Sequence, residues 1–506
     1  ASMIERVEVM RGGGSALFGS SAIAGTINII TKEPLRNSGQ LSHTITSLGG
    51  SSSFDNNTSL NVSLVTDDHR AGLYIFGQNR YRSGYDYDGD GFTELPKLKN
   101  QTVGFRSYLK TSTYSKLTFE YHHMQEFRRG GDMLNRPPHE AHIAEQLQHS
   151  IDGGSLKFDY FSPDEKNRLS VFASAANTDR DSYYGPGNDP LKAYGKTTDL
   201  TAMGGAQYVH TFDKCFFMPS DLTAGLEYNR DRLKDNMWGY NRHTDQTVNI
   251  YSAFLQNEWK NDRWGILIGG RLDKHNMVDN VIFSPRANLR FNPTQNINLR
   301  LSYSSGFRAP QAFDEDMHIE NVGGTVAMIE RAKDLKEEKS QSFSVSADMY
   351  HRFGAFQTNL LIEGFYTRLT DVFVLGEPYD RGDGILVKTR SNGPGAKVMG
   401  LTLEGKVAYL SILQIQAGLT LQRSRYDEPH KWHDDAPAEK KIFRTPDTYG
   451  YFTATCTPIK PLSIALSGTY TGRMLVQRMD ITAENAELGK MPERKAEAIR
   501  TPRFFD

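Results

Sequence analysis

The sequence predicts an all-β protein, a transmembrane antiparallel β-barrel that follows a short separate segment. Apolar and polar residues alternate along many stretches of roughly 10 to 15 residues, enough to cross a bilayer at a tilt. The connections between these stretches alternate between short and long, as in barrels of the outer membrane. The mean hydropathy is −0.55, and no run of about 18 apolar residues is present, which excludes a helical membrane protein.

The separate segment is expected at residues 1–34, and the barrel at residues 35–506. Ile4 to Arg11 alternates apolar and charged residues, which predicts a strand. Three glycines follow, which tolerate positive φ angles, and Ala22 to Thr31 is a second β-rich run. Because this piece is too short to bury its own apolar side chains, we expect it to pack against the rest of the chain.

The strands of the predicted barrel have one apolar and one polar face. Residues Phe283–Phe291, Ile297–Ser304 and Leu413–Gln422 show the alternation most clearly. The polar faces carry Arg and Gln, which suit a water-filled lumen, and there are too many strands for one soluble sandwich. We expect about nineteen strands between Gln40 and Gly472, and a further strand that begins near Thr501.

Short turns and long loops alternate along the chain. Thr66–His69 and Pro458–Pro461 are two of the short turns, whereas Gly306–Lys336 and Arg473–Ile499 are two of the long loops. In outer-membrane barrels the long loops face the outside of the cell. The sequence therefore predicts a barrel with short turns at one end and long loops at the other.

The composition excludes several classes of function. The net charge is −1 and no basic stripe is present, which argues against nucleic acid as a partner. No nucleophile–base–acid set, phosphate loop or zinc signature appears, so we expect no enzyme. Cys215 and Cys456 fall about ten predicted strands apart, and we expect both to be free thiols.

The opening residues match a known pattern. Ile4 to Pro34 reads IERVEVMRGGGSALFGSSAIAGTINIITKEP. This stretch resembles the last part of the plug domain of TonB-dependent outer-membrane receptors, I-E-R-I-E-V-x-R-G-P-x-S-x-x-Y-G and then G-x-I-N-I-I-T-K. Gly13 replaces the usual Pro and Phe18 the usual Tyr, both mild departures. Residues 306–310, Gly-Phe-Arg-Ala-Pro, match the F/Y-R-A-P motif of the same family.

The resemblance implies a multi-pass barrel in the outer membrane of a Gram-negative bacterium, with 22 strands when complete and about 19–20 present here. It implies that the chain is a fragment that lacks most of the plug and the last strands. It also implies that the inner-membrane TonB–ExbB–ExbD complex acts through a segment upstream of Ala1. A surface lipoprotein is a further partner of some members, and the loop after Pro310 is similar to that of Bacteroidetes members.

The function that follows from the resemblance is active import of a metal chelate. The leading cargo is an iron complex, either a siderophore or haem, and cobalamin (vitamin B12) is the alternative. In another class, a passive porin or a barrel adhesin would explain the strands but not the plug segment. No cofactor is required by this reading, since a haem or a ferric chelate would be cargo.

The resemblance also suggests contacts between plug and barrel. Residues 399–404, Met-Gly-Leu-Thr-Leu-Glu, resemble the start of a family strand, so Glu404 would face the lumen near the plug. Arg6 and Arg11 are its natural partners, because a buried carboxylate needs a charged or hydrogen-bonding mate. A solvated lumen carboxylate is the alternative for Glu404.

An acidic run in a predicted external loop could bind calcium. Asp86, Asp88 and Asp90 occupy alternate positions, and Gly91 and Glu94 follow. This spacing collects hard oxygen ligands around a sharp turn. The run is not an EF-hand, because Glu94 is the ninth residue counted from Asp86, whereas an EF-hand places its Glu at the twelfth position. The alternative is an ordinary acidic surface turn.

Four residues of the external loops are candidates for contact with the cargo. His318 lies in the interval where haem-uptake members carry an axial ligand, so the resemblance makes it a candidate for haem iron. Its alternative is an ion pair with the carboxylates before it. The other three candidates are Arg308 of the F-R-A-P motif and the loop aromatics Tyr85 and Trp238.

Overall fold

We describe a computed structural model of the chain. The described residues are 3–11, 23, 25–186, 194–312, 320–322, 325–382, 385–432, 436–481 and 494–506. Within them, no helix is both long enough and apolar enough to cross a membrane.

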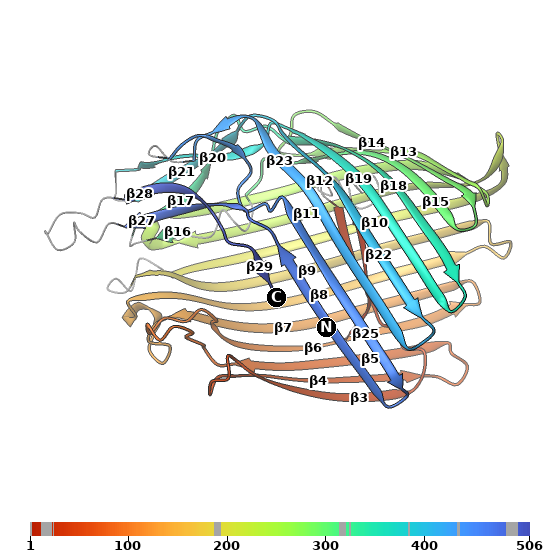
Figure 1. Ribbon diagram of the computed structural model, residues 1–506, viewed down its shortest axis with the longest axis horizontal. Coiled ribbons are helices and arrows are strands. Elements are labelled where there is room, and N and C mark those ends of the chain that lie inside the picture. Colours follow the sequence, from red (N-terminus) through yellow and green to blue (C-terminus); the bar gives the residue numbers. More distant parts are fainter. Residues whose placement is uncertain are drawn as a thin grey trace, which may run out of the picture.

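One large antiparallel sheet curves into a barrel (Figure 1). Each strand pairs with the next strand in the wall, and short turns join the strands at one end. The wall consists of β3 (Ser38–Ser47), β4 (Phe54–Val65), β5 (Ala71–Arg82), β6 (Lys97–Ser112), β7 (Ser115–Gly131), β8 (Ile143–Phe161), β9 (Asn167–Pro186), β10 (Tyr194–Cys215), β11 (Met218–Met237), β12 (Arg242–Lys260), β13 (Trp264–His275), β14 (Ile282–Thr294), β15 (Ile297–Arg308), β18 (Glu338–Phe353), β19 (Phe356–Thr370), β22 (Ala396–Tyr409), β23 (Leu413–His430), β24 (Glu439–Lys441), β25 (Thr448–Ile459), β26 (Leu462–Thr471) and β29 (Phe504–Phe505).

Nineteen wall strands have ten residues or more in the part of the chain that the structure describes. They run from β3 to β26, which confirms the predicted number and limits. The predicted later strand corresponds to β29, which is only two residues long.

The wall is not closed between β26 and β3. In the order of the strands only β29 stands between them, and it pairs with β26 at Tyr470 and Thr471 alone. All ten residues of β3 are exposed, and so are the first six of β26. The edges of these two strands therefore lack a full-length neighbour.

Three smaller sheets are separate from the sheet of the wall. A hairpin of β1 (Ile4–Arg11) and β2 (Gly25–Thr31) stands at the N-terminal end. The loops after β15 and β19 supply a four-stranded sheet, and the loop after β26 supplies a hairpin. These strands are β16 (Glu320–Val322), β17 (Thr325–Arg331), β20 (Phe373–Asp380), β21 (Leu386–Asn392), β27 (Leu475–Ile481) and β28 (Arg494–Arg500).

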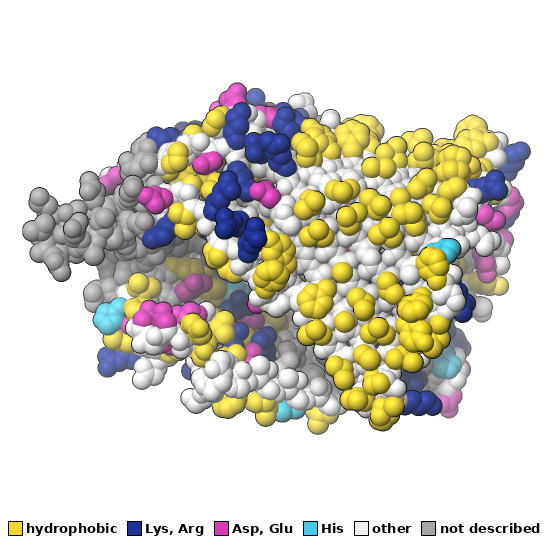
Figure 2. Space-filling model, in the orientation of Figure 1, with side chains coloured by type: hydrophobic (Ala, Val, Ile, Leu, Met, Phe, Trp, Pro, Cys, Tyr) yellow, Lys and Arg dark blue, Asp and Glu magenta, His cyan; other side chains and the backbone are white. Residues whose placement is uncertain are grey.

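The two faces of the wall differ as the alternation predicts. On β22, Leu401 is 41% exposed and Leu403 38%, whereas Thr402 between them is 6% exposed. Thr402 and Thr420 of β23 share a hydrogen bond on the inner face. Apolar side chains therefore cover the outside, as the broad yellow area in Figure 2 shows, and polar side chains line the inside.

Candidate ligand-binding mouth

The external loops pack into a common core at the loop end of the barrel. Tyr183 and Met237 have no exposed surface, and Met328 is 1% exposed. Tyr240 donates a hydrogen bond from Oη to the carbonyl oxygen of Tyr184 at 3.2 Å. This core, which we call the mouth core, comprises Ala141, Ala144, Leu147, Tyr183, Tyr184, Met237, Tyr240, Met328 and Ile385.

The mouth core joins loops that are far apart in the chain. Its residues come from the ends of β8, β9 and β11, from η2 (Trp238–Tyr240), and from the four-stranded sheet. Arg381 donates a hydrogen bond to the carbonyl oxygen of Tyr240 at 2.8 Å. The four-stranded sheet of β16, β17, β20 and β21, which we call the small sheet, is therefore tied to the loop after β11. No sequence pattern predicts this contact, because Tyr183 and Tyr240 are buried together with Met328 and Ile385, which follow roughly 90 to 200 residues later in the chain.

Arg308 supports the mouth through contacts at the top of β15. Its guanidinium carbon lies 5.4 Å from the centre of the Phe373 ring, a cation–π distance. The backbone N–H of Phe373 also donates to Oε2 of Glu338 at 2.9 Å. Arg308 is thus half-buried between wall and small sheet, and its contact with cargo stays a prediction.

The two aromatic candidates belong to different loops. Trp238 in η2 is 57% exposed, beside the buried Tyr240. Tyr85 is half-buried, forms a bridge with Leu95, and lies 6.4 Å from the Tyr87 ring. Trp238 is therefore the candidate that is open to a ligand in solution.

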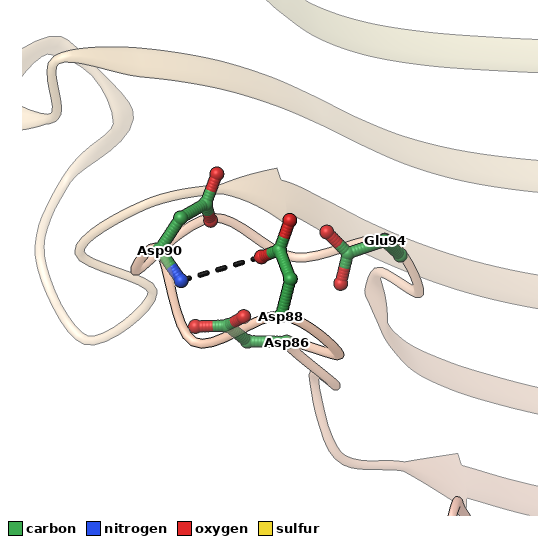
Figure 3. Close-up of side chains that lie close together, drawn as sticks. All are labelled: Asp86, Asp88, Asp90 and Glu94. Carbon is green, nitrogen blue, oxygen red and sulfur yellow. Dashed lines mark hydrogen bonds between the residues drawn. The ribbon is translucent and has the colours of Figure 1, made fainter.

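The acidic run forms a compact loop between β5 and β6 (Figure 3). One carboxylate oxygen from each of Asp86, Asp88, Asp90 and Glu94 lies within 4.8 Å of the other three. Asp86 accepts hydrogen bonds from the N–H groups of Gly89 (2.7 Å) and of Gly91 (2.9 Å). This spacing of four hard oxygen donors fits a cation of the size of Ca²⁺, and calcium binding stays a prediction.

The N-terminal segment contacts the wall through residues that the motifs did not indicate. Arg106, on the inner face of β6, bonds Thr31 and lies 3.2 Å from Glu33. Lys116 of β7 also lies 3.2 Å from Glu33. By contrast, Val9 of the hairpin is 65% exposed and Ile27 69%, so these two apolar side chains do not show the expected packing.

The predicted plug–barrel cluster is described only in part. Arg6 pairs with Glu8 of its own strand at 2.8 Å. Glu404 is half-buried on β22 and, like Thr402, lies at an inner-face position. The side chain of Arg11 and the whole of His318 lie outside the described residues. Their roles stay predictions.

Comparison with known proteins agrees with this architecture. The family described as "TonB dependent receptor-like, beta-barrel" matches residues 24–475. The chain is 27% identical over 322 residues to the iron-regulated outer membrane virulence protein of Vibrio cholerae serotype O1. That match covers 61% of this chain and 45% of the relative, so the chain spans about half the length of this relative.

Two solved structures share the fold at low identity. The siderophore receptor PirA from Acinetobacter baumannii superposes with a TM-score of 0.77 at 16% identity, covering 99% of this chain and 78% of that one. A ferric enterobactin receptor (PfeA) variant from Pseudomonas aeruginosa, in complex with enterobactin, gives a TM-score of 0.77, 16% identity, and coverages of 99% and 77%. The chain belongs to the family of TonB-dependent outer-membrane receptors, of which it carries the β-barrel.

Proposed function

We propose that this chain forms the barrel of an active importer that carries an iron complex, a siderophore or haem, across the outer membrane. The observation that carries the proposal is the family match over most of the barrel. The curated relative is named for its iron regulation, and the two solved structures are named as a siderophore receptor and a ferric enterobactin receptor.

The mouth supports capture of a large ligand from outside the cell. The packed core holds the loops in fixed positions, so exposed side chains such as Trp238 are presented on a rigid base. Rigid presentation lowers the ordering cost of binding. Coupling to the TonB complex is part of the same proposal, since passive diffusion would not concentrate a scarce chelate.

Direct binding to the full-length receptor in detergent tests the proposal. The receptor would be titrated with a ferric catecholate siderophore, with haem and with cobalamin, each with and without calcium. Tight binding of one iron complex supports the proposal, and binding of cobalamin alone would overturn the iron assignment. A Soret shift that His318→Ala abolishes would assign haem as cargo and His318 as its ligand.

Uptake into cells tests the energy requirement. A receptor-null strain that expresses the full-length protein should take up the bound iron complex only when TonB is present. Equal uptake without TonB would instead support a passive porin.

The residues of the acidic loop favour cobalamin as the second candidate cargo, because calcium-ordered loops accompany cobalamin import in this family.

A further inference from the structure

The loop between β7 and β8 carries two histidines at the mouth, and their surroundings differ. His139 lies in η1 (Pro138–Glu140), is half-buried, and has its Nδ1 atom 2.9 Å from Oη of Tyr194. Its ring also lies 6.1 Å from the Tyr194 ring. The side chain of His142, by contrast, is 74% exposed. His142 is therefore the histidine of this loop that a ligand from outside the cell can reach.

A buried carboxylate sets the orientation of this exposed imidazole. Nδ1 of His142 lies 2.6 Å from Oδ2 of Asp132, whose side chain is only 9% exposed. Because a carboxylate accepts hydrogen bonds, Nδ1 is the protonated nitrogen of the neutral ring, and Nε2 carries the lone pair. Nε2 has no hydrogen-bond partner among the residues that the structure describes. The ring therefore presents a free lone pair to the solvent.

Asp132 is itself held from several sides. Its Oδ1 atom accepts the backbone N–H of Ile143 at 3.2 Å, and its own N–H donates to the carbonyl oxygen of Ile143 at 3.2 Å. Its carbonyl oxygen accepts Nη2 of Arg129 at 3.1 Å, and Arg129 is 1% exposed. On either side of the exposed histidine, Ala141 and Ala144 are buried in the mouth core. The imidazole thus stands on a rigid base, as a metal ligand requires.

A second pair of this kind faces the membrane instead. Nδ1 of His123 lies 2.8 Å from Oδ1 of Asp152, whose side chain is 46% exposed. His123 shares one face of β7 with Phe119 and Tyr121, which are 43% and 39% exposed. This pair therefore lies on the outer face of the wall, and its carboxylate is not buried. Only the pair at the mouth combines a buried carboxylate with an imidazole open to the outside.

A single imidazole suits one kind of metal complex. In the part of the chain that the structure describes, only the acidic loop brings three or more metal-binding side chains together, so a bare cation would find one donor at His142. A hexadentate siderophore fills the coordination positions of its iron with its own oxygens. Haem iron is held by the porphyrin nitrogens and leaves an axial position open, which a neutral imidazole can occupy.

The neighbouring side chains match the rest of a haem. Ile143 is 45% exposed and Pro137 is exposed, so apolar surface lies close to the imidazole along the chain. Arg136 is exposed and forms no ion pair with any described residue. Its backbone N–H donates to the carbonyl oxygen of Met133 at 2.9 Å, which holds the turn. A haem has an apolar ring and propionate carboxylates, and a guanidinium can donate two parallel hydrogen bonds to a carboxylate.

We propose that His142 is an axial ligand of haem iron at the mouth, which rests on the proposed import of an iron complex and names haem as that complex. Nε2 donates its lone pair to the iron, while the proton on Nδ1 stays in its hydrogen bond to Asp132. Asp132 acts as a positioning residue, because a carboxylate on the second ring nitrogen fixes the ring and makes the ligand more basic.

Visible absorption of the full-length receptor in detergent, titrated with ferric haem, tests this assignment. Wild type should show a Soret shift, and His142→Ala should weaken haem binding by about tenfold or more. His142→Cys should give the Soret band of thiolate-ligated haem, which a purely structural role of His142 would not produce. Asp132→Asn should keep the imidazole-type spectrum but weaken binding by about tenfold, since the ring loses its charged partner.

Matched controls separate ligation from a change in fold. His243→Ala removes another exposed histidine near the mouth, whose Nδ1 atom lies 2.9 Å from Oδ1 of Asn236, and should leave the Soret shift unchanged. Metal-free protoporphyrin should bind wild type and His142→Ala equally, because it offers no iron to the imidazole.

Three results would overturn the assignment. The first is equal haem affinity of wild type and His142→Ala, and the second is an unchanged Soret band in His142→Cys. The third is a receptor that binds a ferric siderophore but not haem, which would leave the proposed import of an iron complex standing. A receptor that binds no iron complex at all would overturn the proposed function as well.

Discussion

Arg331 donates a hydrogen bond through Nη1 to Oε1 of Gln246 at 2.9 Å, across 85 residues of sequence. The same oxygen accepts the backbone N–H of Ala312 at 2.8 Å, and Gln246 is 5% exposed. One buried amide on β12 therefore holds both the chain after β15 and the end of β17. It fixes the small sheet over the loop end of the wall.

Replacing Gln246 with Leu should loosen the small sheet. The backbone N–H of Ala312 would lose its acceptor, at a cost of about 1–3 kcal/mol. Arg331 would lose one acceptor but keep its hydrogen bond to the carbonyl oxygen of Pro310. Hydrogen exchange of the β17 amides should become at least tenfold faster, because local opening governs their exchange. Gln414→Leu, at an exposed position near a turn, is the control. Unchanged exchange in β17 would show that other contacts hold the sheet.

Calcium should bind the acidic loop with a Kd of about 10⁻⁴–10⁻³ M, the range of extracellular sites. Calorimetry of the full-length receptor would measure it. Asp88→Asn removes one charged ligand and should weaken binding by about tenfold, whereas Asp68→Asn, in a turn between β4 and β5, should not. The calcium assignment fails if wild type and Asp88→Asn give the same isotherm.

A ferric siderophore should quench the fluorescence of Trp238. This side chain is 57% exposed at the mouth, whereas Trp264 lies at the turn end, stacked 4.3 Å from the Phe291 ring. Trp238→Phe should remove most of the ligand-dependent quenching, and Trp264→Phe should retain it. If Trp238→Phe keeps the full change, the ligand binds away from η2.

Acid should weaken the loop that follows β7. Burial alone would raise the pKa of Asp132, but hydrogen bonds from His142 and from the Ile143 N–H bring that pKa below its ordinary value of 3.8. A lowered pKa means that the carboxylate stabilises the loop above pH 3.8, and that this contribution is lost as the pH falls below 3.8 through the folded-state pKa.

Hydrogen exchange of the Ile143 amide measures this effect. Its protection should fall between about pH 4 and pH 2, and Asp132→Asn should show low protection that hardly changes over this range. The exposed Asp213→Asn, at the β10–β11 turn, serves as the control. A pH profile shared by wild type and Asp132→Asn would contradict the role of this carboxylate.

The strands and the family were predictable because both depend on local sequence. Alternation at Leu401, Thr402 and Leu403 sets which side of β22 faces outward, whatever strand lies beside it. The turns were equally local, and the oxygens of Asp86 and Glu94 converge because they are only eight positions apart. The expected free thiols are also found, at Cys215 and Cys456.

Contacts between distant segments were not predictable in this way. Arg106 and Glu33 are 73 residues apart, and no sequence pattern pairs them. Tyr183, near the end of β9, is fully buried. In the mouth core it lies with Met328 and Ile385, which come from the loops after β15 and β19.

The sequence by itself determined the strands, their faces and the family, because side-chain alternation and motif spacing are properties of adjacent residues. Only the tertiary structure decided which strands are neighbours at each level, and so placed Arg368, Lys397 and Arg425 in one row and Gln246 beneath Arg331. Register and loop packing depend on how the whole sheet curves, which no single stretch of the chain records.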